Sequence, residues 1–147
     1  MNDKKEINQR NNDRFLPSGK MIDNRFEIKE PIRKTSGCIV YRANDKTNNT
    51  DKALLIIPPI IKVDFEAMDS LRESAQLLKW LNHPYIARYY GLHTSGEYTF
   101  FEMEFVPGKS VKRKKFESPN KIFSENMAKW GALQILEGLS FAHKQNI

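Results

Sequence analysis

Few side chains in this sequence have a type and spacing that could support catalysis or metal binding. The histidines His83, His93 and His143 are scattered along the chain, and Cys38 is the only cysteine. A zinc site needs several Cys, His or carboxylate ligands held together, and a hydrolase-type serine lies in a G-x-S-x-G turn. Neither pattern occurs, so the sequence predicts no metal site and no hydrolase-type catalytic residue.

Cations gather in one segment of the chain. Between residues 109 and 121 there are six cations and one carboxylate, so this segment carries +5 of the net charge of +6. The cluster consists of Lys109, Lys112, Arg113, Lys114, Lys115 and Lys121. Such a segment can hold an acidic protein, a nucleic acid or an anionic lipid surface, but it is also typical of a solvated loop or helix face. Both interpretations stay open.

The composition favours a folded domain without a membrane span. Hydrophobic residues make up 39% of the chain, and no run approaches the roughly 20 apolar residues that a spanning helix needs. The polar start, MNDKKEINQRNNDR, has no apolar stretch behind it, so we expect a disordered tail over residues 1–15 rather than a secretory signal. A cytoplasmic location is the default, and a lone cysteine is consistent with a reducing compartment.

The order of secondary structure follows from the spacing of the apolar residues. Apolar and polar residues, bounded by turn formers, predict three antiparallel strands over residues 25–32, 38–43 and 53–57. Helical spacing predicts a helix over residues 65–81, which His83-Pro84 ends. Two further strands are expected over residues 86–92 and 98–106, so the predicted fold class is α+β with a five-stranded antiparallel sheet and one helix.

A long apolar helix is predicted at the end of the chain. Ser124 is its expected N-cap, and the helix runs to about Lys144. Its apolar residues lie on nearly all sides of the axis; they are Met127, Ala128, Trp130, Leu133, Ile135, Leu136, Leu139, Phe141 and Ala142. A helix of this type is expected to be buried on nearly all sides, and no later segment covers it. We therefore expect a protein partner or self-association through residues 124–144.

The order of these elements, together with short motifs, resembles the amino-terminal lobe of a protein kinase. Leu81-Asn-His-Pro84 follows the first helix, and Phe101-Glu-Met-Glu-Phe-Val-Pro-Gly108 resembles a kinase hinge with Met103 at the gatekeeper position. The lead-in LPSGKMIDNRFEIKEPI is most similar to bacterial Hanks-type serine/threonine kinases, and QILEGLSFAHKQNI resembles the first large helix of the carboxy-terminal lobe.

This resemblance implies a division of the chain and a place for the catalytic residues. The amino-terminal lobe would cover residues 16–106. The hinge, the basic segment and the first helix of the carboxy-terminal lobe would cover residues 107–147. The catalytic aspartate, the metal-binding asparagine and the DFG aspartate of a kinase would then belong to sequence beyond Ile147.

The resemblance also allows the glycine-rich loop to be checked. A kinase needs glycines there because side chains would obstruct the approach of backbone amides to the phosphates. Counted back from Val40, the three glycine positions fall on Arg33, Thr35 and Cys38, so none is kept. Gly37 stands one place away, where a hairpin glycine would also stand.

The lysine and glutamate positions of the family are also substituted. Leu55, 15 residues after Val40, stands where a kinase has its phosphate-binding lysine, and Ser74 stands where the partner glutamate would be. Lys52 is three positions from Leu55 and should point to the other face of the strand. Glu73 is one residue from the glutamate position, which is roughly 100° around a helix.

These substitutions imply a vestigial nucleotide pocket, and they leave three alternative functions for the chain. The pocket would comprise Gly37, Val40, Ala53, Leu55, Ser74, Met103, Glu104 and Val106. No cofactor is firmly predicted, although the apolar walls and the hinge backbone leave weak ATP or adenine binding open. The chain would be a catalytically inactive pseudokinase fragment with a binding or regulatory role, part of a degenerate but active ATP-dependent serine/threonine kinase whose catalytic half lies outside it, or a basic interaction module for an acidic partner.

Overall fold

One antiparallel sheet forms the centre of the molecule. The computed structural model describes residues 15–35, 38–57, 65–118, 120 and 122–147. The sheet has the strand order β1-β2-β3-β4-β6-β5, and every neighbouring pair is antiparallel. Its strands are β1 (Met21–Ile22), β2 (Phe26–Lys34), β3 (Ile39–Asp45), β4 (Thr50–Ile57), β5 (Tyr89–Ser95) and β6 (Tyr98–Glu104). The helices are α3 (Phe65–Leu78), α4 (Val111–Glu117) and α5 (Glu125–Lys144).

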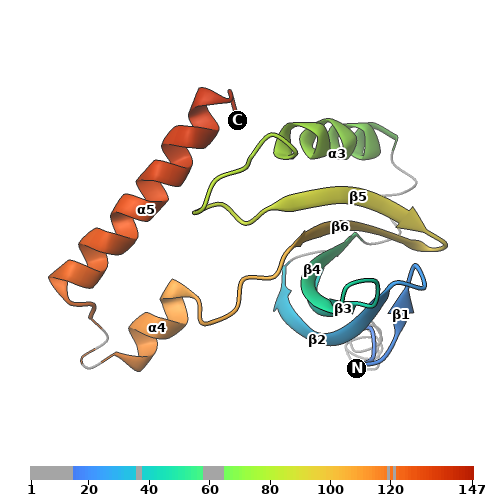
Figure 1. The fold of residues 1–147 in the computed structure, drawn as a ribbon, viewed down its shortest axis with the longest axis horizontal. Coiled ribbons are helices and arrows are strands. Elements are labelled where there is room, and N and C mark those ends of the chain that lie inside the picture. The colour runs from blue at the N-terminus through green and yellow to red at the C-terminus, as the bar shows by residue number, and fades with distance from the viewer. Residues whose placement is uncertain (1–14, 36–37, 58–64, 119, 121) are drawn as a thin grey trace, which may run out of the picture.

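The two faces of the curled sheet bury different apolar clusters. Figure 1 shows α3 beside β5, while α4 and α5 lie beyond the end of β6. One face is closed by the sheet's own curl around the buried residues Ile22, Phe26, Ile28, Ile39, Tyr41, Ala43, Leu54 and Phe100. The other face meets α3 in a second cluster of Ile57, Ala75, Tyr89 and Phe101, against which Leu55, Leu71, Leu78, Leu92 and Met103 pack. Alternation along each strand separates the two sets.

The predicted α+β class and the five long strands are confirmed, with several corrections at the ends of elements. The sheet gains a two-residue edge strand, β1, and β5 begins at Tyr89 rather than at residue 86. Helix α3 ends at Leu78 rather than at residue 81, because Leu81 N bonds Leu78 O in a tighter turn. The segment before Tyr89 is a turn closed by Ile86 N and His83 O.

The predicted long helix, α5, is confirmed, and it contacts the rest of the chain mainly through its carboxy-terminal half. Ser124 is its N-cap and accepts a hydrogen bond from Met127 N at 3.3 Å. Gly138 is its one buried residue within the described chain and lies against Ile86, while Phe141 stacks on His83 with ring centroids 5.1 Å apart. The remaining large apolar side chains of α5 are exposed, namely Met127, Trp130, Leu133, Ile135, Leu136 and Leu139. None of the described helices is long and apolar enough to span a membrane.

Candidate functional site

The strand register brings four of the predicted pocket residues together. Val40 of β3 lies opposite Leu55 of β4, and Ala53 of β4 lies opposite Met103 of β6. Directly paired residues of antiparallel strands point to the same face, and so do residues two apart on one strand. The four side chains therefore form one patch across three strands, in which Ala53 is buried and the other three are half-buried.

Leu55 belongs to the apolar cluster beneath α3. It lies opposite Phe101 in the sheet and packs, with Leu71 and Leu78 of the helix, against a cluster that includes Ala75. A leucine side chain offers neither a charge nor a hydrogen-bond donor. At this position the sheet and the helix are therefore joined by apolar contact rather than by an ion pair.

Ser74 and Glu73 are both exposed on α3. The buried residue of this turn is Ala75, which joins the cluster that holds Leu55. Glu73 forms no ion pair within the described part of the chain. The structure thus separates Ser74 from the patch formed by Val40, Ala53, Leu55 and Met103, although the sequence groups it with them.

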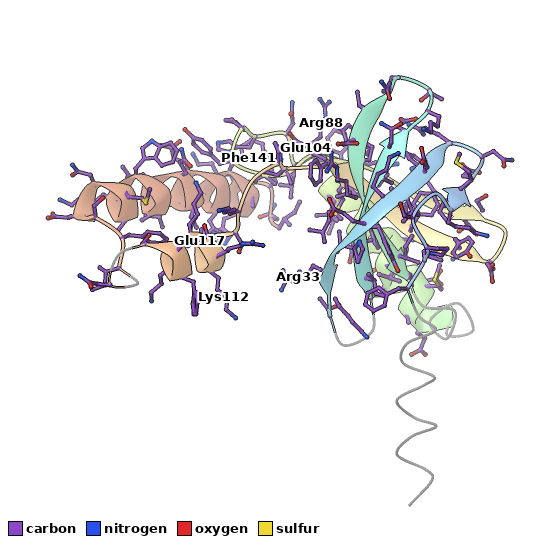
Figure 2. The ribbon with its side chains drawn as sticks, turned by 90° about the horizontal axis from the view of Figure 1, so that it is seen from below. Arg33, Arg88, Glu104, Lys112, Glu117 and Phe141 are labelled. Atoms are coloured by element: carbon purple, nitrogen blue, oxygen red, sulfur yellow. The ribbon has the colours of Figure 1, made fainter. Side chains whose placement is uncertain are left out.

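The loop between β2 and β3 is closed by its own hydrogen bonds. Thr35 donates both its backbone N–H and its hydroxyl to Cys38 O, over 2.9 and 3.1 Å. The donors at this position are therefore used inside the hairpin. Arg33 lies opposite Val40 at the exposed end of β2, and Figure 2 shows its side chain extending toward the side of the molecule where α4 lies. Gly37 lies outside the described residues.

Lys52 points away from Leu55, as the alternation of the strand predicts. Its ammonium lies 3.6 Å from the ring centroid of Tyr90 and 3.8 Å from Glu102 Oε1. Both contacts lie on the face of the sheet that carries Leu54 and Phe100. The lysine is therefore held where it cannot replace a cation at position 55.

The end of β6 leaves part of its backbone open. Glu104 is tied to the segment before β5, since its N–H donates to Arg88 O over 2.8 Å and its carboxylate accepts from Arg88 N over 2.9 Å. Figure 2 shows Arg88 and Glu104 close together at this point. Val106 is 62% exposed, and its backbone forms no hydrogen bond within the described residues.

Comparison with known proteins decides the family. The model of the protein kinase domain matches residues 26–147, which covers the patch and the segments around it. The chain belongs to the protein kinase domain family. It is 28% identical over 129 residues to a probable serine/threonine-protein kinase of Clostridium acetobutylicum and 27% identical over 129 residues to Aurora/IPL1-related protein kinase 2 of Caenorhabditis elegans.

The solved structures agree on the fold of this kinase-family chain. The PknI kinase domain of Mycobacterium tuberculosis matches with a TM-score of 0.71 at 15% identity, over 89% of this chain and 52% of that chain. The two curated relatives are matched over 88% of this chain but over only 19% and 42% of their own lengths. The chain thus spans about half of a kinase domain and less than half of either relative. It has the amino-terminal lobe of the family and the start of the carboxy-terminal lobe.

A buried ion network in this kinase lobe was missed by the sequence analysis. The side chain of Glu102 is 4% exposed, and three cationic or titratable groups surround it. Arg25 Nη2 lies 3.4 Å and Lys52 Nζ 3.8 Å from Oε1, while His93 Nε2 lies 3.1 Å from Oε2. The burial of Glu102 could have been predicted from the strand pattern, because Glu102 is two residues from Phe100 and so lies on the same buried face.

Asp45 extends this network and makes the kinase lobe sensitive to acid. Arg25 donates to both carboxylate oxygens of Asp45, over 3.0 and 2.7 Å, and the Asp45 side chain is fully buried. These hydrogen bonds from Arg25, with further ones from Thr47, hold the pKa of Asp45 well below its ordinary value. A lowered pKa in the folded state means that the stabilisation is complete above the unfolded pKa of about 3.8 and is lost as the pH falls below it.

We therefore expect the free energy of unfolding to decrease between pH 5 and pH 3, and we expect this decrease to be smaller in Asp45→Asn. Urea titrations of both proteins at a series of pH values measure the difference. The matched control is Asp69→Asn, which changes an exposed carboxylate of α3 that pairs with Arg72. Equal pH dependence in Asp45→Asn and the unsubstituted chain would contradict the assignment.

The basic cluster of the sequence is a helix over most of its length rather than a loop. Helix α4 carries Lys112, Arg113, Lys114 and Lys115, and none of its residues is buried. Lys109 lies just before it, whereas Lys121 is outside the described residues. A cavity of about 640 Å³ separates α4 from α5, and its lining includes Glu104, Val106 and Lys114. Neither Val40, Ala53, Leu55 nor Met103 lines this cavity, so it is distinct from the patch on the sheet.

Proposed function

We propose that this chain is part of a pseudokinase domain, which acts by binding and regulation rather than by phosphoryl transfer. The main support for this proposal is the environment of Leu55. The side chain at the lysine position of the family packs into the apolar cluster with Leu71, Ala75 and Leu78 of α3. Phosphoryl transfer in kinases depends on a lysine that neutralises the phosphates and pairs with a glutamate of this helix. In this chain Leu55 stands at the lysine position and Ser74 at the glutamate position, so neither charge is present there.

Three further features support the proposal. The only lysine near that position on the strand, Lys52, is directed to the opposite face by Glu102 and Tyr90. Ser74 is exposed, so the helix offers no side chain for an ion pair at this point. The hydrogen bonds of Thr35 to Cys38 use loop donors that a phosphate would require.

A nucleotide role limited to adenine is compatible with this proposal. The patch formed by Val40, Ala53 and Met103 offers an apolar surface, and the backbone at Val106 is open. Neither feature contacts phosphate. The proposed vestigial pocket would hold the base weakly and would gain nothing from the triphosphate or its magnesium ion.

Isothermal titration calorimetry tests this proposal. We expect Mg²⁺-ATP and adenosine to bind equally weakly or not at all, because Leu55 and Ser74 offer no charge to the phosphates. Ala53→Phe fills the patch and should remove any adenosine binding, while Thr50→Phe, at the exposed far end of the same strand, serves as its control. A magnesium-dependent affinity for ATP well above that for adenosine, lost in Ala53→Phe, would rule out the inactive assignment.

The second candidate is an active but degenerate serine/threonine kinase, for which the family match is the observation in favour. In that case the catalytic half would lie outside this chain. Sequence that follows Ile147 in the gene would have to carry the HRD and DFG motifs. If these motifs were absent, the candidate would fail.

The exposed apolar side chains of α5 support a binding role for either candidate. Trp130, Leu133 and Leu136 are each more than half exposed. Surfaces of this kind are stable when another protein surface covers them. We propose that α5 contacts further protein, in the same molecule or in a partner.

A further inference from the structure

Two large apolar side chains at the end of α3 reach into solvent. Leu77 is 49% and Trp80 is 74% exposed, and Trp80 is held directly after the helix because its backbone N–H donates to Leu77 O over 3.1 Å. Leu77 lies about 160° around the helix from the buried Ala75, so it points away from the sheet. Tryptophan is enriched among the residues that anchor protein interfaces.

Carboxylates continue this exposed side of α3. Glu66 and Glu73 are exposed and lie within about 40° of Leu77 around the helix axis. Neither carboxylate forms an ion pair within the described part of the chain. We name Glu66, Glu73, Leu77 and Trp80 the α3 ridge. It presents apolar groups beside unpaired negative charge, in a chain whose net charge is +6.

The cavity between α4 and α5 has the opposite charge. Most of its lining is apolar and includes Val111 of α4 with Trp130 and Ile135 of α5. Lys114 also lines the cavity, and Lys115 lies on the same side of α4, about 40° from Val111 around the axis. Neither lysine has an ion pair within the residues that the structure describes.

An indole side chain fits this cavity. The volume of about 640 Å³ lies in the range of pockets that hold drug-sized molecules. Glu104 is the one carboxylate among the described lining residues, and it already accepts a hydrogen bond from Arg88 N. Positive charge from Lys114 and Lys115 therefore lies beside an apolar hollow. Such a site is complementary to an apolar side chain that is flanked by carboxylates.

The α3 ridge and the cavity are separate surfaces of one molecule. Trp80 does not line the cavity, and Figure 1 shows α4 beyond the end of β6, away from α3. We propose that the α3 ridge of one copy docks into the cavity between α4 and α5 of a second copy, with the Trp80 indole inside the cavity. The carboxylates of the ridge then face Lys114 and Lys115.

This contact is heterologous, because the two surfaces that meet are different. It joins two copies reciprocally or extends head to tail into longer assemblies. The inference rests on the binding role proposed for α5, for which it names the partner as a second copy of this chain. It does not depend on the nucleotide positions of the sheet.

Sedimentation velocity of the 147-residue chain at increasing concentration tests this proposal. We expect the mass to rise above that of the monomer with concentration, and the association to weaken as salt is raised. Trp80→Ala should weaken the association at least about 30-fold, which is the loss expected for a tryptophan at the centre of an interface.

A charge exchange shows whether these two surfaces meet. Lys114→Glu with Lys115→Glu should remain monomeric, because like charges would face each other in the contact. Glu66→Lys with Glu73→Lys should remain monomeric for the same reason. An equal mixture of the two double variants should regain the association, since each reversed surface then meets its complement.

The control is Lys20→Glu with Lys112→Glu, which makes the same change of net charge at exposed lysines outside the contact. Figure 2 shows Lys112 on the side of α4 that is turned away from α5, so this pair should associate like the unsubstituted chain. Circular dichroism checks that each variant is folded.

Three results would overturn the proposal. The chain could stay monomeric at every concentration, or the mixture could associate no more than its separate components. Association that persists in Trp80→Ala and in both charge variants would also overturn it, because the exposed side chains of α5 would then pair with each other. None of these results bears on the pseudokinase assignment, which the calorimetry of Mg²⁺-ATP and adenosine tests separately.

Discussion

Replacing Glu102 with alanine is expected to lower the free energy of unfolding by about 3–5 kcal/mol. Glu102 is 3% exposed, and it is the carboxylate that Arg25 approaches from the turn before β2, Lys52 from β4 and His93 from β5. Its removal would leave Lys52, whose side chain is only 11% exposed, without its carboxylate. Uncompensated buried charge is costly because the interior cannot solvate it as water does. Chemical denaturation followed by circular dichroism measures the change.

Glu137→Ala is the matched control for this experiment. Glu137 is exposed on α5 and has no ion pair within the described chain, so its loss should change the free energy of unfolding by no more than about 0.5 kcal/mol. Glu102→Gln keeps the shape and removes the charge, and it should lie between the two. If Glu102→Ala were as stable as the control, the network around Glu102 would not contribute to the stability of the lobe.

Restoring the family's lysine by Leu55→Lys is expected to destabilise the chain by about 3 kcal/mol and not to create Mg²⁺-ATP binding. The new ammonium would enter the cluster of Leu71, Ala75 and Leu78, which offers it no carboxylate. Burial of an unpaired lysine disfavours its charged form. Denaturation measures the stability, and calorimetry measures the nucleotide affinity.

The second substitution Ser74→Glu should not rescue Leu55→Lys, because Ser74 is exposed whereas Ala75 faces the cluster. Leu77→Lys on the exposed side of the same helix is the control for the added charge, and it should cost less than about 1 kcal/mol. If the double variant bound Mg²⁺-ATP and kept the stability of the unsubstituted chain, the apolar packing would not be the obstacle to nucleotide binding that we infer.

The sequence predicted most of the lobe because its strands and helices are coded locally. Alternation or apolar runs bounded by turn formers predicted the five long strands, and helical spacing of apolar residues predicted α3. The ends of the elements were harder to predict. At residues 79–81 the apolar spacing continues into a tighter turn, so the pattern alone did not show where α3 ends. The short helix α4 was missed because its basic residues have no apolar periodicity over seven residues.

The candidate site also combines features that the sequence predicts with features that depend on tertiary packing. The family positions could be counted along the sequence, and the strand register shows that Val40, Ala53, Leu55 and Met103 share a face of the sheet. Whether Ser74 lies near these four residues could not be predicted from the sequence, because this depends on how α3 is rotated against the sheet. The helix buries Ala75 there and leaves Ser74 in solvent, since packing selects the apolar side chain for the contact.

The sequence by itself predicted a kinase-family lobe, which the comparisons confirm, because local periodicity and short motifs suffice for the fold. Counting along the sequence also predicts that Leu55, Ser74 and the residues before Val40 stand at the lysine, glutamate and glycine-loop positions of the family. Only the tertiary structure decided what occupies the space that those residues would have used. Leu55 packs beneath α3, Thr35 bonds within its hairpin, and Lys52 is held on the opposite face by Glu102. The contacts of Leu55 with α3 and of Lys52 with Glu102 join different elements of the chain, and no local pattern encodes these partners, whereas the bond between Thr35 and Cys38 is local.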